Sequence, residues 1–320
     1  MQRTTATFAI SLLVLCVGGC GASYTWLGRH DWSALDDLPC MRGLSVRTNG
    51  LATAVDDAGE GWIWDLRSGK VLLTAADAVA TTLSANGEVA AVADARGRIR
   101  VFRPSTNALL GELDTGIAGK YRWLCLSTSA SLLAVAGPGN EAAVWDVHAG
   151  RKLVSASTAG PALAVALSEE DGLLFVGDLQ GVSMWNVRSG ACTGRLTAEK
   201  PKPVVRLALS GSSTVAATDA DSAVHVWQWR TGALLFNTPP RSDIPARSSC
   251  FSPDGRLLAI VSESGNVSVH EVTTGSRIRT FFTCRGPFDD AVLTEEGHAT
   301  VTVGPGHGWP RVFAIDPPLW

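Results

Sequence analysis

The stretch of sequence that decides the fold is residues 251–272, which read FSPDGRLLAIVSESGNVSVHEV. It contains an apolar residue followed by Ser, then a Pro-Asp-Gly turn, an apolar run at residues 257–261 and an alternating run at residues 267–269. Short apolar or alternating runs bounded by turn-forming residues are typical of β-strands rather than of helices. The stretch therefore predicts short strands that are joined by tight turns.

The same pattern recurs along the chain with a period of 38 to 43 residues. The first marker is a Ser or Thr after an apolar residue, and it stands at Ser45, Ser84, Ser127, Ser168, Ser210, Ser252 and Thr294. The second marker is large and mostly aromatic, and it stands at Trp64, Phe102, Trp145, Trp185, Trp227, His270 and Phe313. Five residues after six of these markers comes Gly or Asn, the residue types that accept a left-handed backbone in a tight turn. Two markers that share one period and one phase predict seven repeats of four strands.

The chain resembles WD40-repeat β-propellers over roughly residues 23–320. The likeness is carried by the turn at residues 251–255 and by four third-strand segments, Ile63-Trp64-Asp65-Leu66, Val144-Trp145-Asp146-Val147, Met184-Trp185-Asn186-Val187 and Val226-Trp227-Gln228-Trp229. The resemblance implies an all-β fold, a seven-bladed β-propeller of four-stranded antiparallel blades.

The repeats depart from the family pattern in their polar residues. Only two repeats keep the Trp-Asp pair, and none has the family's Gly-His pair in its usual place. The buried hydrogen-bond network that links that His to a turn Asp is therefore missing or rebuilt. Four carboxylates that precede the third strand are candidates to tighten this turn: Asp57, Asp94, Asp178 and Asp221. His270 occupies a Trp position, which predicts a packed, hydrogen-bonded structural role.

The seventh repeat lacks a fourth strand of its own, because Pro318 stands where the turn Gly is expected. Residues 23–35 precede the first repeat and are available to supply that strand. We therefore predict a ring closed by an N-terminal strand, which protects an edge that is otherwise open to aggregation.

The N-terminus reads as an export signal. Arg3 is the only charge before an apolar run from Phe8 to Val17, which is shorter than the roughly 20 residues of a membrane-spanning helix. Val17-Gly18-Gly19-Cys20 resembles the bacterial lipoprotein box, in which the Cys becomes the lipidated first residue. We expect a signal peptide at 1–19, a lipid-anchored N-terminus and ring-closing strand at 20–35, and the propeller at 36–320, located in the cell envelope. The alternatives are an ordinary cleaved signal, which gives a soluble secreted protein, and an uncleaved anchor.

Composition and motifs exclude several classes of function. With 46% hydrophobic and 18% charged residues, the chain does not have the composition of a disordered protein. A net charge of -3 lacks the basic footprint of nucleic-acid binding. The six His show no metal-ligand spacing, and no Gly-x-Ser-x-Gly nucleophile motif occurs. The sequence therefore predicts no catalytic residue, no metal site and no cofactor.

Candidate binding residues come from the start of each innermost strand, near the channel mouth where WD-repeat proteins commonly receive partners. The positions four residues before the Ser/Thr markers are Met41, Ala80, Trp123, Ala164, Arg206, Ser248 and Asp290. Trp123 is the large outlier, and Tyr121 and Arg122 adjoin it. Aromatic and Arg side chains dominate interface hot spots. We predict that Trp123, Tyr121, Arg122 and Arg206 bind a partner, with filling of a gap between blades as the alternative role of Trp123.

These observations favour a non-enzymatic scaffold for protein–protein interaction, built on a monomeric propeller that is tethered to an envelope membrane through Cys20. The alternative is an enzyme or a small-ligand-sensing propeller with its site in the central channel. That alternative needs clustered His or carboxylate side chains on the innermost strands. Segments such as 163–166 and 206–209 are instead mostly small and apolar.

Overall fold

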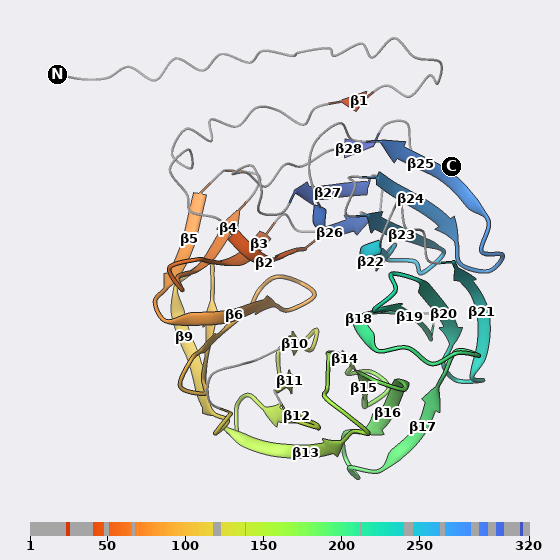
Figure 1. Cartoon of the computed structure of the whole chain (residues 1–320). Helices are drawn as coiled ribbons and strands as arrows, with labels where there is room; N and C mark the ends of the chain where they lie inside the picture. The colour runs from red at the N-terminus through yellow and green to blue at the C-terminus, as the bar shows by residue number, and fades with distance from the viewer. Residues whose placement is uncertain are drawn as a thin grey trace.

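The computed structural model describes residues 24–25, 41–47, 51–65, 68, 70–117, 123–137, 139–211, 213–239, 246–262, 266–282, 288–293, 299–303 and 314–315. Over these residues the chain consists of β-strands and turns, and the strands are arranged around a ring (Figure 1). The predicted all-β class is confirmed.

Six four-stranded antiparallel sheets, each made of four consecutive strands, are consistent with propeller blades. Blade 1 contains β2 (Met41–Val46), β3 (Leu51–Asp56), β4 (Gly61–Asp65) and β5 (Lys70–Ala75). Blade 2 contains β6 (Ala78–Leu83), β7 (Ala90–Asp94), β8 (Arg98–Arg103) and β9 (Ala108–Asp114). Blade 3 contains β10 (Trp123–Leu126), β11 (Leu132–Ala136), β12 (Glu141–Asp146) and β13 (Arg151–Ser157).

The other three blades follow the same order. Blade 4 contains β14 (Ala164–Ser168), β15 (Leu173–Asp178), β16 (Gly181–Asn186) and β17 (Cys192–Leu196). Blade 5 contains β18 (Val204–Ser210), β19 (Thr214–Asp219), β20 (Val224–Gln228) and β21 (Ala233–Thr238). Blade 6 contains β22 (Ala246–Phe251), β23 (Leu257–Ser262), β24 (Asn266–Glu271) and β25 (Arg277–Phe282).

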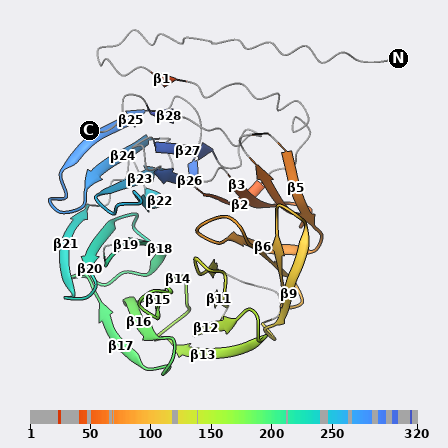
Figure 2. The ribbon, with the colours of Figure 1, turned by 180° about the vertical axis from the view of Figure 1, so that it is seen from behind.

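Two shorter pairings complete the described strands. β26 (Phe288–Leu293) pairs antiparallel with β27 (Ala299–Val303), and β1 (Tyr24–Thr25) pairs antiparallel with β28 (Ala314–Ile315). The first strands of successive sheets contact one another in the order β2, β6, β10, β14, β18, β22, β26, and β26 also contacts β2. In both ribbon views these strands surround the centre of the ring, and β5, β9, β13, β17, β21 and β25 lie at its periphery (Figures 1 and 2).

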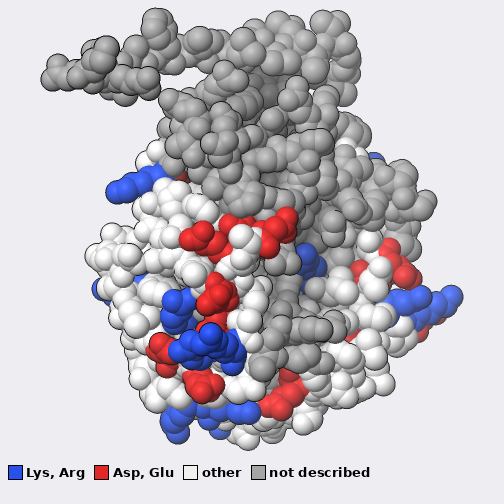
Figure 3. All heavy atoms as spheres, turned by 60° about the vertical axis from the view of Figure 1, so that its left-hand side comes forward, with Lys and Arg blue, Asp and Glu red and all other residues white. Residues whose placement is uncertain are grey.

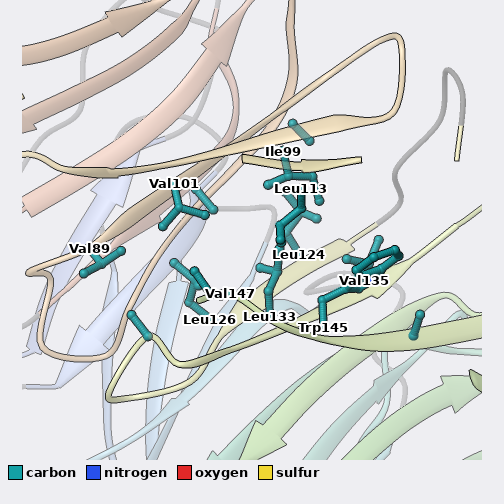
Figure 4. Packing of buried hydrophobic residues seen from close by; sticks show 14 residues of the cluster. Val89, Ile99, Val101, Leu113, Leu124, Leu126, Leu133, Val135, Trp145 and Val147 are labelled. Carbon is teal, nitrogen blue, oxygen red and sulfur yellow. The ribbon is translucent and has the colours of Figure 1, made fainter. Parts of the chain in front are cut away.

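Apolar packing between neighbouring blades forms the core. Every residue of β7, β15, β19 and β23 is buried, because the second strands are rich in Ala, Val and Leu and are covered on both faces. Between blades 2 and 3, Ile99 and Val101 pack with Leu124, Leu133 and their neighbours (Figure 4). Full burial of one such side chain stabilises the fold by about 1.5–3 kcal/mol.

The repeat markers have the structural roles that their spacing predicts. His270 is buried, its Nε2 lies 3.1 Å from Ser268 Oγ, and its Nδ1 lies 3.3 Å from the carbonyl oxygen of Gly275. Its predicted structural role is therefore confirmed.

The turn after the third strand has a left-handed residue in every blade whose turn is described, including Asn107 at a φ of 55°. An Asn in this place shows that backbone conformation, and not composition alone, selects the residue.

The described residues do not test the predicted export signal and lipid anchor. The proposed signal peptide, residues 1–19, and Cys20 lie outside the described residues. Among the residues that are described, no helix is long and apolar enough to cross a membrane.

Candidate functional site

Two of the four predicted binding residues lie against each other. Trp123 is the first residue of β10 and Arg206 the third residue of β18. The guanidinium carbon of Arg206 lies 4.5 Å from the centroid of the Trp123 ring, a cation–π contact. Both residues are half-buried. Tyr121 and Arg122, the other two, lie outside the described residues.

The strand between β10 and β18 carries a small residue at the equivalent position. β14 contacts both β10 and β18, and Ala164 occupies this position on β14. Ala164 is fully buried, and its side chain ends at Cβ. The Trp123–Arg206 contact thus joins blades 3 and 5, which flank blade 4.

The backbone of β18 carries a β-bulge directly before Arg206. Its pairing with β19 shifts register between Val204 and Arg206, so Val205 is an extra residue. Such a bulge changes the direction of the side chain that follows it. The pairs β10–β11 and β14–β15 run without a shift, whereas β2, β6, β22 and β26 carry similar shifts in their pairing with the next strand. The bulge lies directly before Arg206 and so affects the direction of its side chain.

Trp123 also has a packing role. It lies against the apolar cluster between blades 3 and 4, which includes Ala136 and Val165. Trp123 therefore packs between blades, as the alternative role predicts, and its ring also contacts Arg206.

Charged residues on the connection from blade 4 to blade 5 lie shortly before Arg206 in the sequence. Lys200 and Lys202 are exposed, and Lys202 Nζ lies 2.9 Å from Asp221 Oδ2. The hydrogen bond with Asp221 raises the pKa of Lys202. Elsewhere, on the side shown in Figure 3, Lys and Arg are interspersed with Asp and Glu over the described residues. This mixture matches the net charge of -3.

At the ends of the sheets where β10 and β18 begin, the turn between the second and third strands carries a buried carboxylate in four blades. These are Asp56, Asp94, Asp178 and Asp219. Their Oδ1 atoms accept hydrogen bonds from backbone N–H groups of the turn, including those of Glu60, Arg96, Gln180 and Asp221. The prediction for Asp94 and Asp178 is confirmed.

The prediction for Asp57 and Asp221 is wrong. Both are exposed, and the carboxylates that tighten these turns are Asp56 and Asp219, at the ends of β3 and β19. The residue at the end of the strand faces the N–H groups of the turn, whereas Asp57 and Asp221 lie farther along the turn. The distance to the aromatic marker could have identified the correct carboxylates, because it is eight residues for Asp56, Asp94 and Asp219.

The hydrogen-bond network that the WD40 resemblance implies is built here with other donors. Trp62 Nε1 donates to Asp56 at 2.9 Å, Arg98 Nε to Asp94 at 3.2 Å, and Arg195 Nη1 to Asp178 at 2.7 Å. In blade 5, Nε2 of His225 lies 3.0 Å from Asp219 Oδ2. Burial raises the pKa of Asp56 and of Asp94, but hydrogen bonds outweigh burial and hold both pKa values below the ordinary 3.8. These carboxylates are therefore structural.

The arrangement offers packing and charge rather than an assembled metal centre. Within the described segments, no group of three or more His, Cys, Asp or Glu is placed to hold a metal ion. His225 is held by Asp219 and stacks on Trp227, with 5.5 Å between ring centroids.

Comparison with known proteins agrees with these repeats. No protein-family model matches the chain. Over 154 residues it is 31% identical to the WD repeat-containing protein SL1-17 of Schistosoma mansoni, covering 47% of this chain and 50% of that protein. Over 194 residues it is 27% identical to apoptotic protease-activating factor 1 of Danio rerio, covering 60% of this chain and 15% of that protein. The chain thus spans half or less of these relatives. Together with the repeated four-stranded antiparallel sheets, the two similarities support the resemblance to WD40-repeat proteins.

Proposed function

We propose that this protein is a non-enzymatic scaffold for protein–protein interaction, whose partner binds at the Trp123–Arg206 pair. The observation that carries the proposal is the contact itself, an aromatic ring under a guanidinium on the innermost strands. Both residues stand on strands of four-stranded sheets, so their backbones are fixed before a partner arrives. Preorganised aromatic and Arg side chains bind with a smaller loss of conformational entropy.

We further infer a seven-bladed ring. β26 lies between β22 and β2, as the first strand of a seventh blade must. β27 contacts β28, and β1 pairs with β28 through Tyr24 opposite Ile315 and Thr25 opposite Ala314. In this arrangement β26, β27 and β28 come from the C-terminal part of the chain, and β1 supplies the fourth strand. Pairing β1 with β28 in this blade closes the ring and covers the edge of β28.

Export and anchoring complete the proposal. Cys20 receives a lipid after cleavage behind Gly19, which places the propeller in the cell envelope. Intact mass of the membrane-extracted protein tests this, with the Cys20→Ala variant as the comparison. A chain that starts at Cys20 with added diacylglycerol mass, absent in the variant, supports the anchor. An unmodified soluble chain that starts at Met1 contradicts it.

Photocrosslinking tests the binding site directly. A photoreactive amino acid replaces exposed Pro201, on the connection that leads into β18, or exposed Arg188, in the turn between β16 and β17 at the opposite ends of the strands. We expect a discrete protein crosslinked from position 201, lost when Trp123→Leu is added, and absent from position 188. Equal crosslinking from both positions, or crosslinking that survives Trp123→Leu, contradicts the proposed site.

A further inference from the structure

We propose that Leu179 is a further binding residue, against which an apolar side chain of the partner protein packs, an inference that rests on the proposed interaction function of the Trp123–Arg206 pair. It names a chemical group that the partner presents beside that pair.

Leu179 differs from the other exposed apolar residues in its place in the fold. Among the residues that the structure describes, six large apolar side chains are exposed, and five of them lie on the outer strands β9, β21 and β25. Leu179 is 43% exposed and stands in the turn between β15 and β16. This turn lies at the ends of the sheets where the first strands begin, because Gly177 pairs with Ala164 at the start of β14. Leu179 thus shares one end of the ring with Trp123 and Arg206, on the blade between theirs.

Leu179 is also an exception among the repeats. In the four blades with a buried carboxylate at this turn, the next residue is Asp57, Ala95, Leu179 or Ala220, and all four are exposed. A small or charged residue therefore satisfies the turn, and folding does not require a Leu here. A single exposed Leu is ordinary on a protein surface. A Leu that replaces a small or charged residue beside the Trp123–Arg206 pair is explained by binding.

The side chain of Leu179 is held in place by a glycine. A Cβ atom on Gly160 would lie 2.6 Å from Cδ1 of Leu179 and 2.7 Å from its Cγ, so this side chain lies directly over the Gly160 backbone. The Thr158 hydroxyl donates to the carbonyl oxygen of Gly160 at 2.6 Å. The buried carboxylate of Asp178 accepts a hydrogen bond from the Gln180 N–H at 2.8 Å and fixes the turn on both sides of Leu179. The exposed surface of Leu179 is therefore in position before a partner arrives, which lowers the entropy cost of binding.

Leu179 and Trp123 lie against the same connection between blades 3 and 4. Leu179 contacts Gly160 on this connection, and Trp123 packs against the apolar cluster that includes Ala162, two residues farther along. Pro161 stands between these two residues and is half-buried. Because a Leu side chain has no hydrogen-bonding group, it contributes to binding by removing apolar surface from water. An aliphatic or aromatic side chain of the partner is the group that fits beside it.

Methyl NMR of the full-length protein with isotope-labelled Leu methyl groups tests this role, with blocked amino acids as probes. We expect N-acetyl-leucinamide and N-acetyl-tryptophanamide to shift the Leu179 methyl signals, which Leu179→Ser assigns by removing them, and N-acetyl-glutaminamide to leave them unchanged. Leu109 and Leu234 are exposed on outer strands and serve as controls in the same spectrum, with smaller shifts expected. Equal shifts at all three Leu residues, or an equal response of Leu179 to the Gln probe, would overturn the proposal.

Two substitutions connect Leu179 with the partner protein. Leu179→Ser should weaken the crosslink from position 201 about fivefold, which corresponds to about 1 kcal/mol of lost apolar burial. Gly160→Ala keeps Leu179 but displaces its side chain, and should weaken the crosslink as well. Leu109→Ser is the matched control, because it removes an exposed Leu from β9, and it should crosslink as wild type does. Urea denaturation verifies that each variant is folded.

The crosslink from position 201 distinguishes the role of Leu179 from the scaffold function itself. A crosslink that Trp123→Leu abolishes but Leu179→Ser leaves intact retains the scaffold function and rejects Leu179 as a binding residue. Absence of any Trp123-dependent crosslink rejects the scaffold site, even where the Leu179 methyl groups respond to the apolar probes.

Discussion

His225 and Asp219 form a buried pair in blade 5, with Nε2 of His225 lying 3.0 Å from Oδ2 of Asp219. The other carboxylate oxygen, Oδ1, accepts hydrogen bonds from the backbone N–H groups of Asp221 and Ala223. Asp219 therefore joins the turn to the third strand. The imidazole ring of His225 also stacks on Trp227. His225 therefore couples the hydrogen-bond network of the turn to the apolar packing of the blade.

Replacing His225 with Phe tests this coupling. Phe keeps a flat ring against Trp227 but removes the donor, which leaves Oδ2 of Asp219 buried without this partner. An unsatisfied buried acceptor costs about 1–3 kcal/mol, and we expect the free energy of unfolding to fall by that amount. Urea denaturation measures the change. His148→Phe is the control, because His148 is exposed in the turn after β12, and an equal effect of both substitutions would contradict the structural role of the pair.

Much of the fold could be predicted from the sequence because it depends on local spacing. The left-handed turn at Asn107 needs only a residue type and a distance from Phe102, and its φ of 55° agrees. The burial of Trp64 and Trp227 follows in the same way from their place on the third strand. In each case the information lies within one repeat.

The contacts that define the candidate site could not be predicted in this way. The Arg206 contact with Trp123 joins two strands that lie far apart in the sequence, and Arg206 directly follows the extra residue Val205. A bulge moves every following side chain relative to the partner strand, and no residue type marks its position unambiguously. The error at Asp57 has the same origin, since one residue separates the end of a strand from the turn beyond it.

Glu169 links two blades, and its substitution should show a pH-dependent effect. It follows β14 of blade 4, and its carboxylate accepts hydrogen bonds from the Ser129 N–H at 2.9 Å and the Ser131 hydroxyl at 2.8 Å in blade 3. Burial raises the pKa of Glu169, but these hydrogen bonds outweigh burial and hold the pKa below its ordinary 4.5. The stabilisation is thus fully present above pH 4.5 and is lost as the pH falls through the folded-state pKa.

We expect Glu169→Gln to lower the free energy of unfolding by about 1 kcal/mol at neutral pH. The difference from wild type should shrink as the pH falls below 4.5, because wild type then loses the charged acceptor too. Urea denaturation over a series of pH values gives both quantities. Glu170→Gln changes an adjacent, exposed residue and should have little effect at any pH. A pH-independent difference for Glu169→Gln would exclude its charge as the cause.

Gly177, near the end of β15, packs closely against the start of β18. A Cβ atom on Gly177 would lie 2.7 Å from Val204 Cγ1 and 2.8 Å from the Val204 carbonyl oxygen. Val204 begins β18, two residues before Arg206. We therefore expect Gly177→Ala to displace the start of β18, to destabilise the protein by about 1–3 kcal/mol, and to weaken the crosslink from position 201.

Thermal unfolding and photocrosslinking measure the two effects of Gly177→Ala. Gly211→Ala lies at the other end of β18, where a Cβ atom would meet nothing within 4 Å, and should leave both nearly unchanged. Loss of stability with an unchanged crosslink from position 201 would show that the packing at Gly177 does not determine the position of Arg206.

The proposed closure of the ring makes the N-terminal strand a structural part of the propeller. Deleting residues 1–35 removes β1 and leaves β28 without its partner, whereas deleting residues 1–22 retains Tyr24 and Thr25. Each ladder hydrogen bond contributes about 1 kcal/mol, and the exposed edge also becomes available to other chains. We expect the longer deletion to unfold at lower urea concentration and to aggregate, and the shorter one to behave as the full chain does. Equal unfolding midpoints for the two deletions would show that β1 does not close the ring, because the chain that lacks this strand would then be as stable as the chain that keeps it.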